Sequence, residues 1–162
     1  MSTSPKYKRF LKKVDNEFVI CAIRCDKDWI DIEPVKENYG LYHYCVYGSA
    51  RFGIPFQKDY EEINPKDFFN MKEYLNGHVM LEVFEDFYWI GFNTLDKGQD
   101  WNGKLVTDDI LTVEKESWMI CFDGHPIVNN KELSRFDYAQ VYPDKKYEII
   151  LNKGALGLFT KC

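Results

Sequence analysis

The side chains of this sequence that could do chemistry are three histidines, five cysteines and several neighbouring pairs of acids. Paired carboxylates do acid–base work when their surroundings make one of them a better acid than the other. Here the pairs fall at predicted strand ends and turns, where water surrounds both members, so we interpret them as surface charge: Glu61-Glu62, Glu85-Asp86, Asp108-Asp109 and Glu114 with Glu116. His125 lies at a predicted hairpin tip beside Gly124, where a histidine is usually only exposed.

The cysteines do not form a zinc or redox motif. Cys21 and Cys25 are separated by three residues, which places both thiols on one face of a strand, whereas zinc and redox pairs are separated by two. We interpret these thiols as small apolar side chains. The sequence also lacks a serine nucleophile elbow, a phosphate-binding loop and a zinc-binding helix. We therefore predict no catalytic residue, no metal and no cofactor, and we favour a non-enzymatic protein.

The elements that must position these residues are mainly strands. Residues 42–52 and 118–128 share one pattern at a constant offset, in which Cys45 corresponds to Cys121. Each copy is an aromatic and β-branched run, a glycine-centred turn and a return run, which predicts an internal duplication of β-hairpins. Similar runs recur with turn residues between them, as in an all-β sandwich or barrel: 18–23, 29–32, 78–84, 87–92, 110–113, 138–142, 147–151 and 156–159.

Two short helices, at 5–14 and 65–76, complete the predicted elements. Ser4-Pro5 suits the start of the first helix, whose apolar residues recur at helical spacing: Tyr7, Phe10, Leu11 and Val14. Asn64-Pro65 suits the start of the second helix, whose apolar residues share one face: Phe68, Met71 and Leu75.

These elements divide the chain into four segments. A basic helical arm is expected at 1–15, a first β unit with an inserted helix at 16–95, a junction at 96–104 and a second β unit at 105–162. We expect the two β units to form one compact domain.

Charge is distributed unevenly along the chain. The net charge is −5, yet residues 1–13 hold no acid and several basic side chains: Lys6, Lys8, Arg9, Lys12 and Lys13. This arm is expected either to bind an anionic partner or to turn its basic face to water. The remaining body is acidic, which argues against nucleic-acid binding except through the arm.

The sequence also bears on where the protein works. Its beginning lacks the apolar run of a signal peptide, no Asn-x-Ser/Thr acceptor occurs, and the number of cysteines is odd. We therefore expect a cytoplasmic protein with reduced thiols. No apolar run is long enough to cross a membrane. The abundance of Lys, Asn and Tyr fits AT-rich coding, and a virion-associated protein is one hypothesis about the source.

The second half of the chain resembles the strand ladder of the cupins, in segments that follow one another along the sequence: Asp123-Gly124, 127–129, 137–141, 149–151 and 154–159. The first half resembles the same plan more loosely, with 39–52 at the place of the first cupin motif and 78–92 at the place of the second. The resemblance implies a double-stranded β-helix of jelly-roll type. In that family the mouth of the barrel often holds a metal or a small acid or sugar.

The chain departs from the metal-binding cupin pattern. That pattern has two histidines two residues apart, then a carboxylate, then a third histidine on a later strand, so that alternation turns them all inward. Here His43 is followed by Cys45, and the expected acid near Tyr47 is missing. A set of His43, Cys45, His78 and Glu82 can be drawn, but without the paired spacing we expect neighbouring side chains, and not a metal, to hold these residues.

Three hypotheses about function follow. The first is a binding or assembly protein, for example a viral structural or accessory protein, that pairs with itself or a protein partner through an aromatic interface: Tyr42, Tyr44 and Trp89. The second is a cupin-type enzyme or small-ligand binder, for a sugar or nucleotide, with its site at the barrel mouth: His43, Tyr47, His78, Glu82 and Tyr88. The third is an acidic inhibitor of a basic partner protein.

Overall fold

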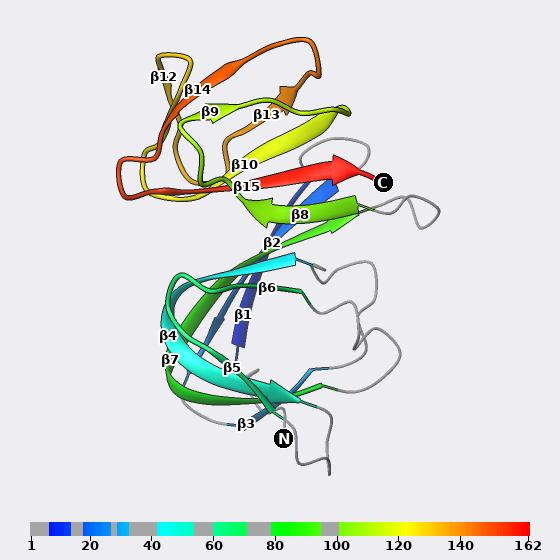
Figure 1. Ribbon diagram of the computed structural model, residues 1–162. Helices are drawn as coiled ribbons and strands as arrows, with labels where there is room; N and C mark the ends of the chain where they lie inside the picture. Colours follow the sequence, from blue (N-terminus) through cyan, green and yellow to red (C-terminus); the bar gives the residue numbers. More distant parts are fainter. Residues whose placement is uncertain are drawn as a thin grey trace. The chain divides into compact units, whose positions relative to one another are not determined.

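The computed structural model describes residues 7–13, 18–26, 29–32, 42–53, 60–70, 79–94 and 101–162 (Figure 1). Strands dominate these residues, and no helix occurs among them. The chain divides into two compact units, Met1–Leu95 and Asp96–Cys162. The described part contains no helix long and apolar enough to cross a membrane.

The first unit is a seven-stranded antiparallel sheet. Its strands are β1 (Tyr7–Lys13), β2 (Phe18–Cys25), β3 (Trp29–Ile32), β4 (Tyr42–Gly53), β5 (Tyr60–Ile63), β6 (Phe68–Asn70) and β7 (Val79–Thr94). The long strands β4 and β7 pair with each other, and each changes its second neighbour part-way along. Residues 42–44 of β4 pair with β6 and residues 50–53 with β5. Residues 79–82 of β7 pair with β3 and residues 87–94 with β2.

The second unit consists of two four-stranded antiparallel sheets, ordered β13-β10-β15-β8 and β12-β11-β14-β9. Its strands are β8 (Trp101–Leu105), β9 (Ile110–Leu111), β10 (Ser117–Asp123), β11 (Ile127–Val128), β12 (Lys131–Glu132), β13 (Tyr138–Val141), β14 (Tyr147–Ile150) and β15 (Ala155–Lys161). This strand order, in which two interleaved Greek keys form two sheets, is that of a jelly roll. Side chains from both sheets form one buried apolar core, among them Met119, Leu158, Val128 and Ile149.

The first unit pairs its strands in the same scheme. In the first unit, one set of neighbouring strands runs in the order β2, the end of β7, the start of β4 and β6. This order matches β8, β15, β10 and β13 of the second unit. A second set runs in the order β3, the start of β7, the end of β4 and β5. This order matches β9, β14, β11 and β12 of the second unit. Each unit by itself therefore has the jelly-roll order that the sequence predicts for the chain as a whole.

The predicted helix at 5–14 is wrong. Residues 7–13 form β1, which pairs with β2 from Tyr7 opposite Cys25 to Lys13 opposite Val19. An isolated helix this short is marginally stable, whereas a strand on the edge of β2 gains a continuous ladder of hydrogen bonds. Pairing with β2 decides the conformation of residues 7–13, and the spacing of apolar residues along the sequence does not reveal that partner. The basic segment is therefore part of the sheet and not a helical arm.

The predicted helix at 65–76 is also wrong where the structure describes it. Phe68–Asn70 form β6, and the preceding residues form a tight turn in which the amide of Asp67 donates to the carbonyl of Asn64 at 3.1 Å. The Asp67 carboxylate accepts a hydrogen bond from the Asn64 amide at 2.8 Å. Asn64, which the sequence analysis places at the start of a helix, therefore begins a turn. Residues 71–76 lie outside the described residues.

Two cysteines hold matching turns in the two units. The Cys45 thiol donates to the carbonyls of Tyr47 at 3.5 Å and Gly48 at 3.7 Å. The Cys121 thiol donates to the carbonyls two and three residues on, at 3.5 and 3.6 Å. Each cysteine also binds a second turn through its backbone. The amide of Cys45 donates to the carbonyl of Asp67 at 2.9 Å, and the amide of Cys121 donates to the carbonyl of Asp137 at 2.8 Å.

Burial keeps both thiols protonated, as this donation requires. It raises the pKa of Cys45 to about 12 and that of Cys121 to about 11, with nearby carboxylates adding to each shift. Cys25, on β2, is also buried, and its pKa is raised to about 12.

Gly48 allows the backbone of β4 to turn beside Cys45. Its φ is +88°, and a Cβ placed on it would lie 2.0 Å from the carbonyl oxygen of Asp86. The register of β4 on β7 shifts between Cys45 and Ala50, so the strand bends here and can pass from β6 to β5.

Replacement of Gly48 by alanine should therefore destabilise the protein. We expect Gly48→Ala to lower the free energy of unfolding by more than about 1 kcal/mol, because the side chain meets backbone at a positive φ. Urea unfolding followed by circular dichroism measures the change. Ser49→Ala is the matched control, expected within about 0.5 kcal/mol of wild type. Equal effects of the two substitutions would contradict the role given to Gly48.

The buried thiols should resist alkylation in the folded protein. At about pH 8 almost no thiolate is present on a thiol whose pKa is raised, and thiolate is the reactive form. Native protein treated with iodoacetamide should be modified at the exposed Cys162 and spared at Cys25, Cys45 and Cys121, as read by peptide mass spectrometry. All four should react in denaturant. Labelling of native Cys45 as fast as Cys162 would disprove this.

Candidate functional site

The interior of the first unit contains the polar aromatic side chains that could form a site. Strand β4 places His43 and Cys45 inward, and β7 places Phe87 and Trp89 inward, because alternate residues of a strand share one face. The His43 ring is 2% exposed and stacks on Phe69, with centroids 4.9 Å apart and planes 14° apart. The edge of the same ring meets Trp89 at 6.2 Å and 73°.

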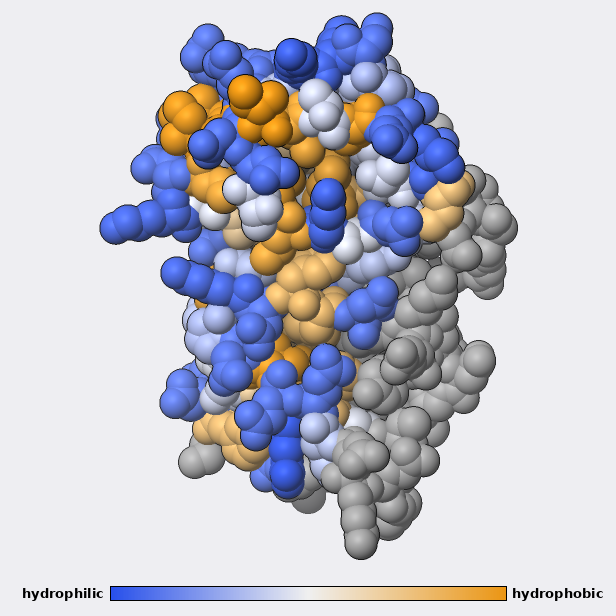
Figure 2. Space-filling model, viewed as in Figure 1, coloured by the Kyte–Doolittle hydropathy of each residue, from blue (hydrophilic) through white to orange (hydrophobic). Residues whose placement is uncertain are grey.

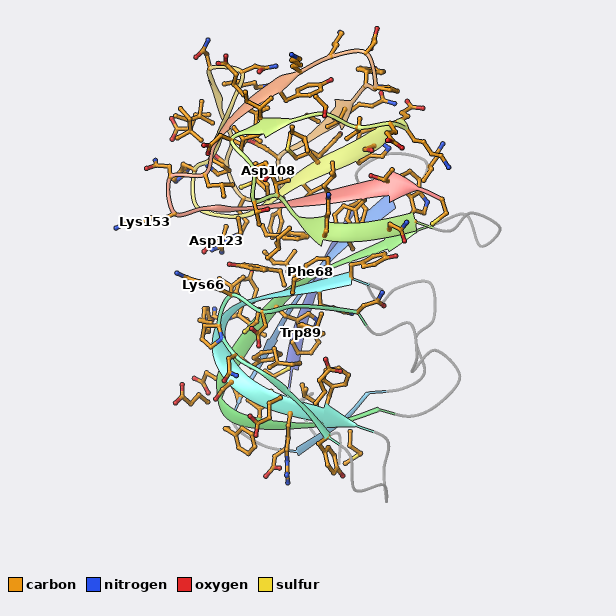
Figure 3. All side chains as sticks on the ribbon, viewed as in Figure 1. Lys66, Phe68, Trp89, Asp108, Asp123 and Lys153 are labelled. Atoms are coloured by element: carbon orange, nitrogen blue, oxygen red, sulfur yellow. The ribbon has the colours of Figure 1, made fainter. Side chains whose placement is uncertain are left out.

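Trp89 brings an unused hydrogen-bond donor into this interior. The residue is 3% exposed, and its indole Nε1–H finds no acceptor within the described part of the chain. Leaving such a donor buried without an acceptor costs about 1–3 kcal/mol. Figure 3 labels Trp89 among the strands of the first unit. A donor of this kind is an anchoring point for a molecule that carries an acceptor.

The second unit shows what the same interior looks like without polar groups. His43 stands opposite Gly91 in the register, and Met119 stands opposite Leu158 at the matching place. Cys45 stands opposite Trp89, and Cys121 opposite Leu156. Methionine and two leucines therefore fill the positions held by histidine, tryptophan and glycine in the first unit.

The core cluster of the second unit is mainly apolar, and two buried hydroxyls of this unit have partners within the chain. The Tyr147 hydroxyl accepts the amide of Tyr142 at 2.9 Å, and the Ser117 hydroxyl donates to the carbonyl of Lys115 at 2.9 Å. The cluster is a packed core. Of the two interiors, the first is the one that could hold a polar ligand.

The described residues do not form a metal site of the cupin kind. Glu82 lies on the opposite face of β7 from Trp89, and its carboxylate accepts a hydrogen bond from the Nε of Arg51 at 2.5 Å. The Cys45 thiol donates to turn carbonyls and not toward His43 or Glu82. Within the described ranges no group of three or more metal-ligating side chains comes together. His78 lies outside these ranges.

The other predicted ligand-binding residues lie on the outer face of the first unit. The register shift after Cys45 turns Tyr47 away from the His43 side of β4. Tyr47, 37% exposed, meets Tyr88 with ring centroids 5.4 Å apart. The structure therefore brings these tyrosines together, but with each other and not with His43.

The predicted interface residues are buried in the chain. Tyr42 is 6% exposed and Tyr44 is 3% exposed, while Trp89 points into the interior. Of the basic residues proposed to meet an anionic partner, four lie on β1 and Lys6 precedes the described residues: Lys8, Arg9, Lys12 and Lys13.

Four residues that the sequence analysis did not identify share the outer face with the tyrosine pair: Arg24, Arg51, Tyr60 and Phe84. Together with Tyr47 and Tyr88 we call them the outer aromatic surface. The Arg24 guanidinium lies 5.8 Å from the Tyr47 ring centroid. That of Arg51 lies 4.8 Å from the Tyr60 ring and 5.8 Å from the Phe84 ring, within cation–π range. Leu81 and Val83 alternate with Glu82 along β7, and Phe84, directly after Val83, breaks this alternation; an apolar residue at an outward position was the signal that could have found the surface.

Apolar side chains interrupt the hydrophilic surface on the face shown in Figure 2. Each unit exposes a few large apolar side chains among the described residues. They are Tyr47 and Phe84 in the first unit, and Ile110, Tyr138, Tyr142 and Ile150 in the second.

Comparison of the structure with solved structures gives matches that extend over nearly the whole chain. A cupin 2 conserved barrel domain protein from Leptotrichia buccalis is 13% identical, with a TM-score of 0.52, over 100% of this chain and 92% of its own. HutD from Pseudomonas fluorescens is 11% identical, with a TM-score of 0.58, over 96% and 95%. YhaK from Escherichia coli is 7% identical, with a TM-score of 0.56, over 94% and 86%.

No protein-family model matches the sequence, and no curated protein does. At identities this low, the likeness concerns the fold alone. The chain is a mainly β protein with a cupin-like fold, as the resemblance of its sequence implies.

Proposed function

We propose that the protein is a cupin-type binder of a small organic molecule, held in the interior of the first unit against His43 and Trp89. The observation that carries the proposal is the buried indole N–H of Trp89, which has no acceptor among the described residues. A bound molecule with an acceptor oxygen or nitrogen would recover the hydrogen bond that folding leaves unmade. The cupin-like neighbours support the choice, because barrels of this kind take ligands at the mouth.

The surrounding side chains indicate which chemical class fits. His43, Phe69 and Trp89 present flat faces and edges, which suits a ring. Arg24 and Arg51, the two arginines of the first unit whose side chains the structure describes, lie on the outer face, so neither offers its guanidinium to a phosphate in the interior. We therefore favour an uncharged ring with acceptors, such as a sugar or a nucleobase. Binding, and not catalysis, is the activity proposed.

We further infer that the two units are copies of one jelly roll that have diverged in their interiors. Their shared pairing order and their matching cysteine turns support this origin. Under this proposal the second unit, with Met119 and Leu156 at the matching positions, is a scaffold without a ligand site.

Removal of the Trp89 donor should weaken binding selectively. A panel of monosaccharides and nucleosides is screened by thermal shift, and the dissociation constant of any hit is measured by calorimetry. Trp89→Phe keeps a ring but loses the N–H, and a lost hydrogen bond of about 1.4 kcal/mol weakens binding about tenfold. Trp118→Phe in the second unit is the matched control and should bind like wild type. Equal losses in both variants, or a panel without a binder, would overturn the proposal.

The matching position in the second unit suggests a further variant. His43→Met installs the residue that the second unit carries there, so the variant should fold with an unchanged circular dichroism spectrum. Because the imidazole is lost, the same ligand should bind at least about tenfold more weakly. Met119→Leu serves as the control for a core substitution in the other unit. Undiminished binding by folded His43→Met would remove His43 from the site.

A further inference from the structure

Charged residues on and beside the outer aromatic surface are not all paired with oppositely charged residues in the part of the chain that the structure describes. Arg51 is paired with Glu82 across the strands β4 and β7. Arg24 is exposed, stands opposite Tyr88 in the register, and forms no ion pair with any described residue. Glu85 and Asp86 are exposed on β7, and neither forms an ion pair within the described part of the chain.

These charges lie on either side of an aromatic centre. Arg24, Tyr88 and Tyr47 form a row across three neighbouring strands. Glu85 stands opposite Ser49, three residues along β7 from that row, which is about 10 Å at the rise of a strand. Phe84 follows on the same strand and is 41% exposed. This face thus presents a cation, then exposed rings, then two acids, and none of these charges forms an ion pair with a described residue.

We propose that the outer aromatic surface binds a second copy of this chain. A two-fold axis through the Tyr47–Tyr88 pair would bring Arg24 of each copy onto Glu85 and Asp86 of the other, since in such an interface residue i meets j and j meets i. The centre consists of tyrosine, phenylalanine and arginine, the residue types that carry most of the binding energy in protein interfaces. No lysine occurs among the six residues of the surface. The proposal is independent of the ligand site in the interior.

A charge exchange tests the two-fold geometry. Arg24→Glu places acid opposite acid in a pair of identical copies, and Glu85→Arg with Asp86→Arg places base opposite base. Each variant alone should lose at least about tenfold in dimer affinity, because like charges face each other at both ends of the interface. An equimolar mixture should dimerise like wild type, since every contact is then between opposite charges. Sedimentation velocity over a dilution series measures the affinities.

The control has the same change in charge at another place. Asp108→Arg with Asp109→Arg alters two adjacent exposed acids in the second unit and should leave the dimer affinity unchanged. Tyr47→Ser tests the aromatic centre and should weaken the dimer without a change in charge. All of these side chains are exposed, and circular dichroism checks that each variant folds. Wild type that stays monomeric at its highest soluble concentration, or a mixture that stays as monomeric as its components, would overturn the proposal.

Discussion

The bend in β4 between Cys45 and Ala50 is the constraint on which the first unit depends. A single strand serves two neighbours, β6 before the bend and β5 after it, and the strand can turn only if a residue at the bend adopts a positive φ without a side chain. Gly48 supplies this conformation, and the Cys45 thiol donates to the carbonyls of Tyr47 and Gly48 in the turn. Because the register shifts at the same place, the bend also decides which side chains face inward. His43 stays inside, and Tyr47 goes to the outer face.

Burial in this fold produces two kinds of surface in the first unit. Inside, the imidazole and the indole lie among phenylalanines, where a hydrogen bond is strong because water is absent. Outside, Arg24 and Arg51 lie over aromatic rings and remain partly exposed, and Arg51 is also paired with Glu82. The two faces of the same strands therefore suit two different kinds of contact, one with a small ring and one with a protein.

The strands and the glycine turns could be predicted from the sequence because their signals are local. The recurrence of Cys45 at Cys121, with a glycine three residues on, identified two turns whose hydrogen bonds match to within a few tenths of an ångström. The strand β1 could not be predicted, because its apolar spacing fits a helix and only the edge of β2 selects the extended form. The orientation of Tyr47 was equally hidden, because one shift of register moves a side chain to the other face. The sequence analysis predicted His43 as a ligand-binding residue and Trp89 as an interface residue, whereas the proposed function places both in one site.

The presence of two jelly rolls with unlike interiors has a consequence for how this protein can change over generations. A hydrophobic core such as that around Met119 and Leu158 tolerates only replacements of similar volume. The interior around His43 contains the Trp89 indole N–H, which has no acceptor among the described residues, so under the proposed function selection there acts on what is bound and not only on stability. Under the same proposal, mutations that change ligand preference can accumulate on one side of the boundary at Leu95 while the other half keeps its packing unaltered.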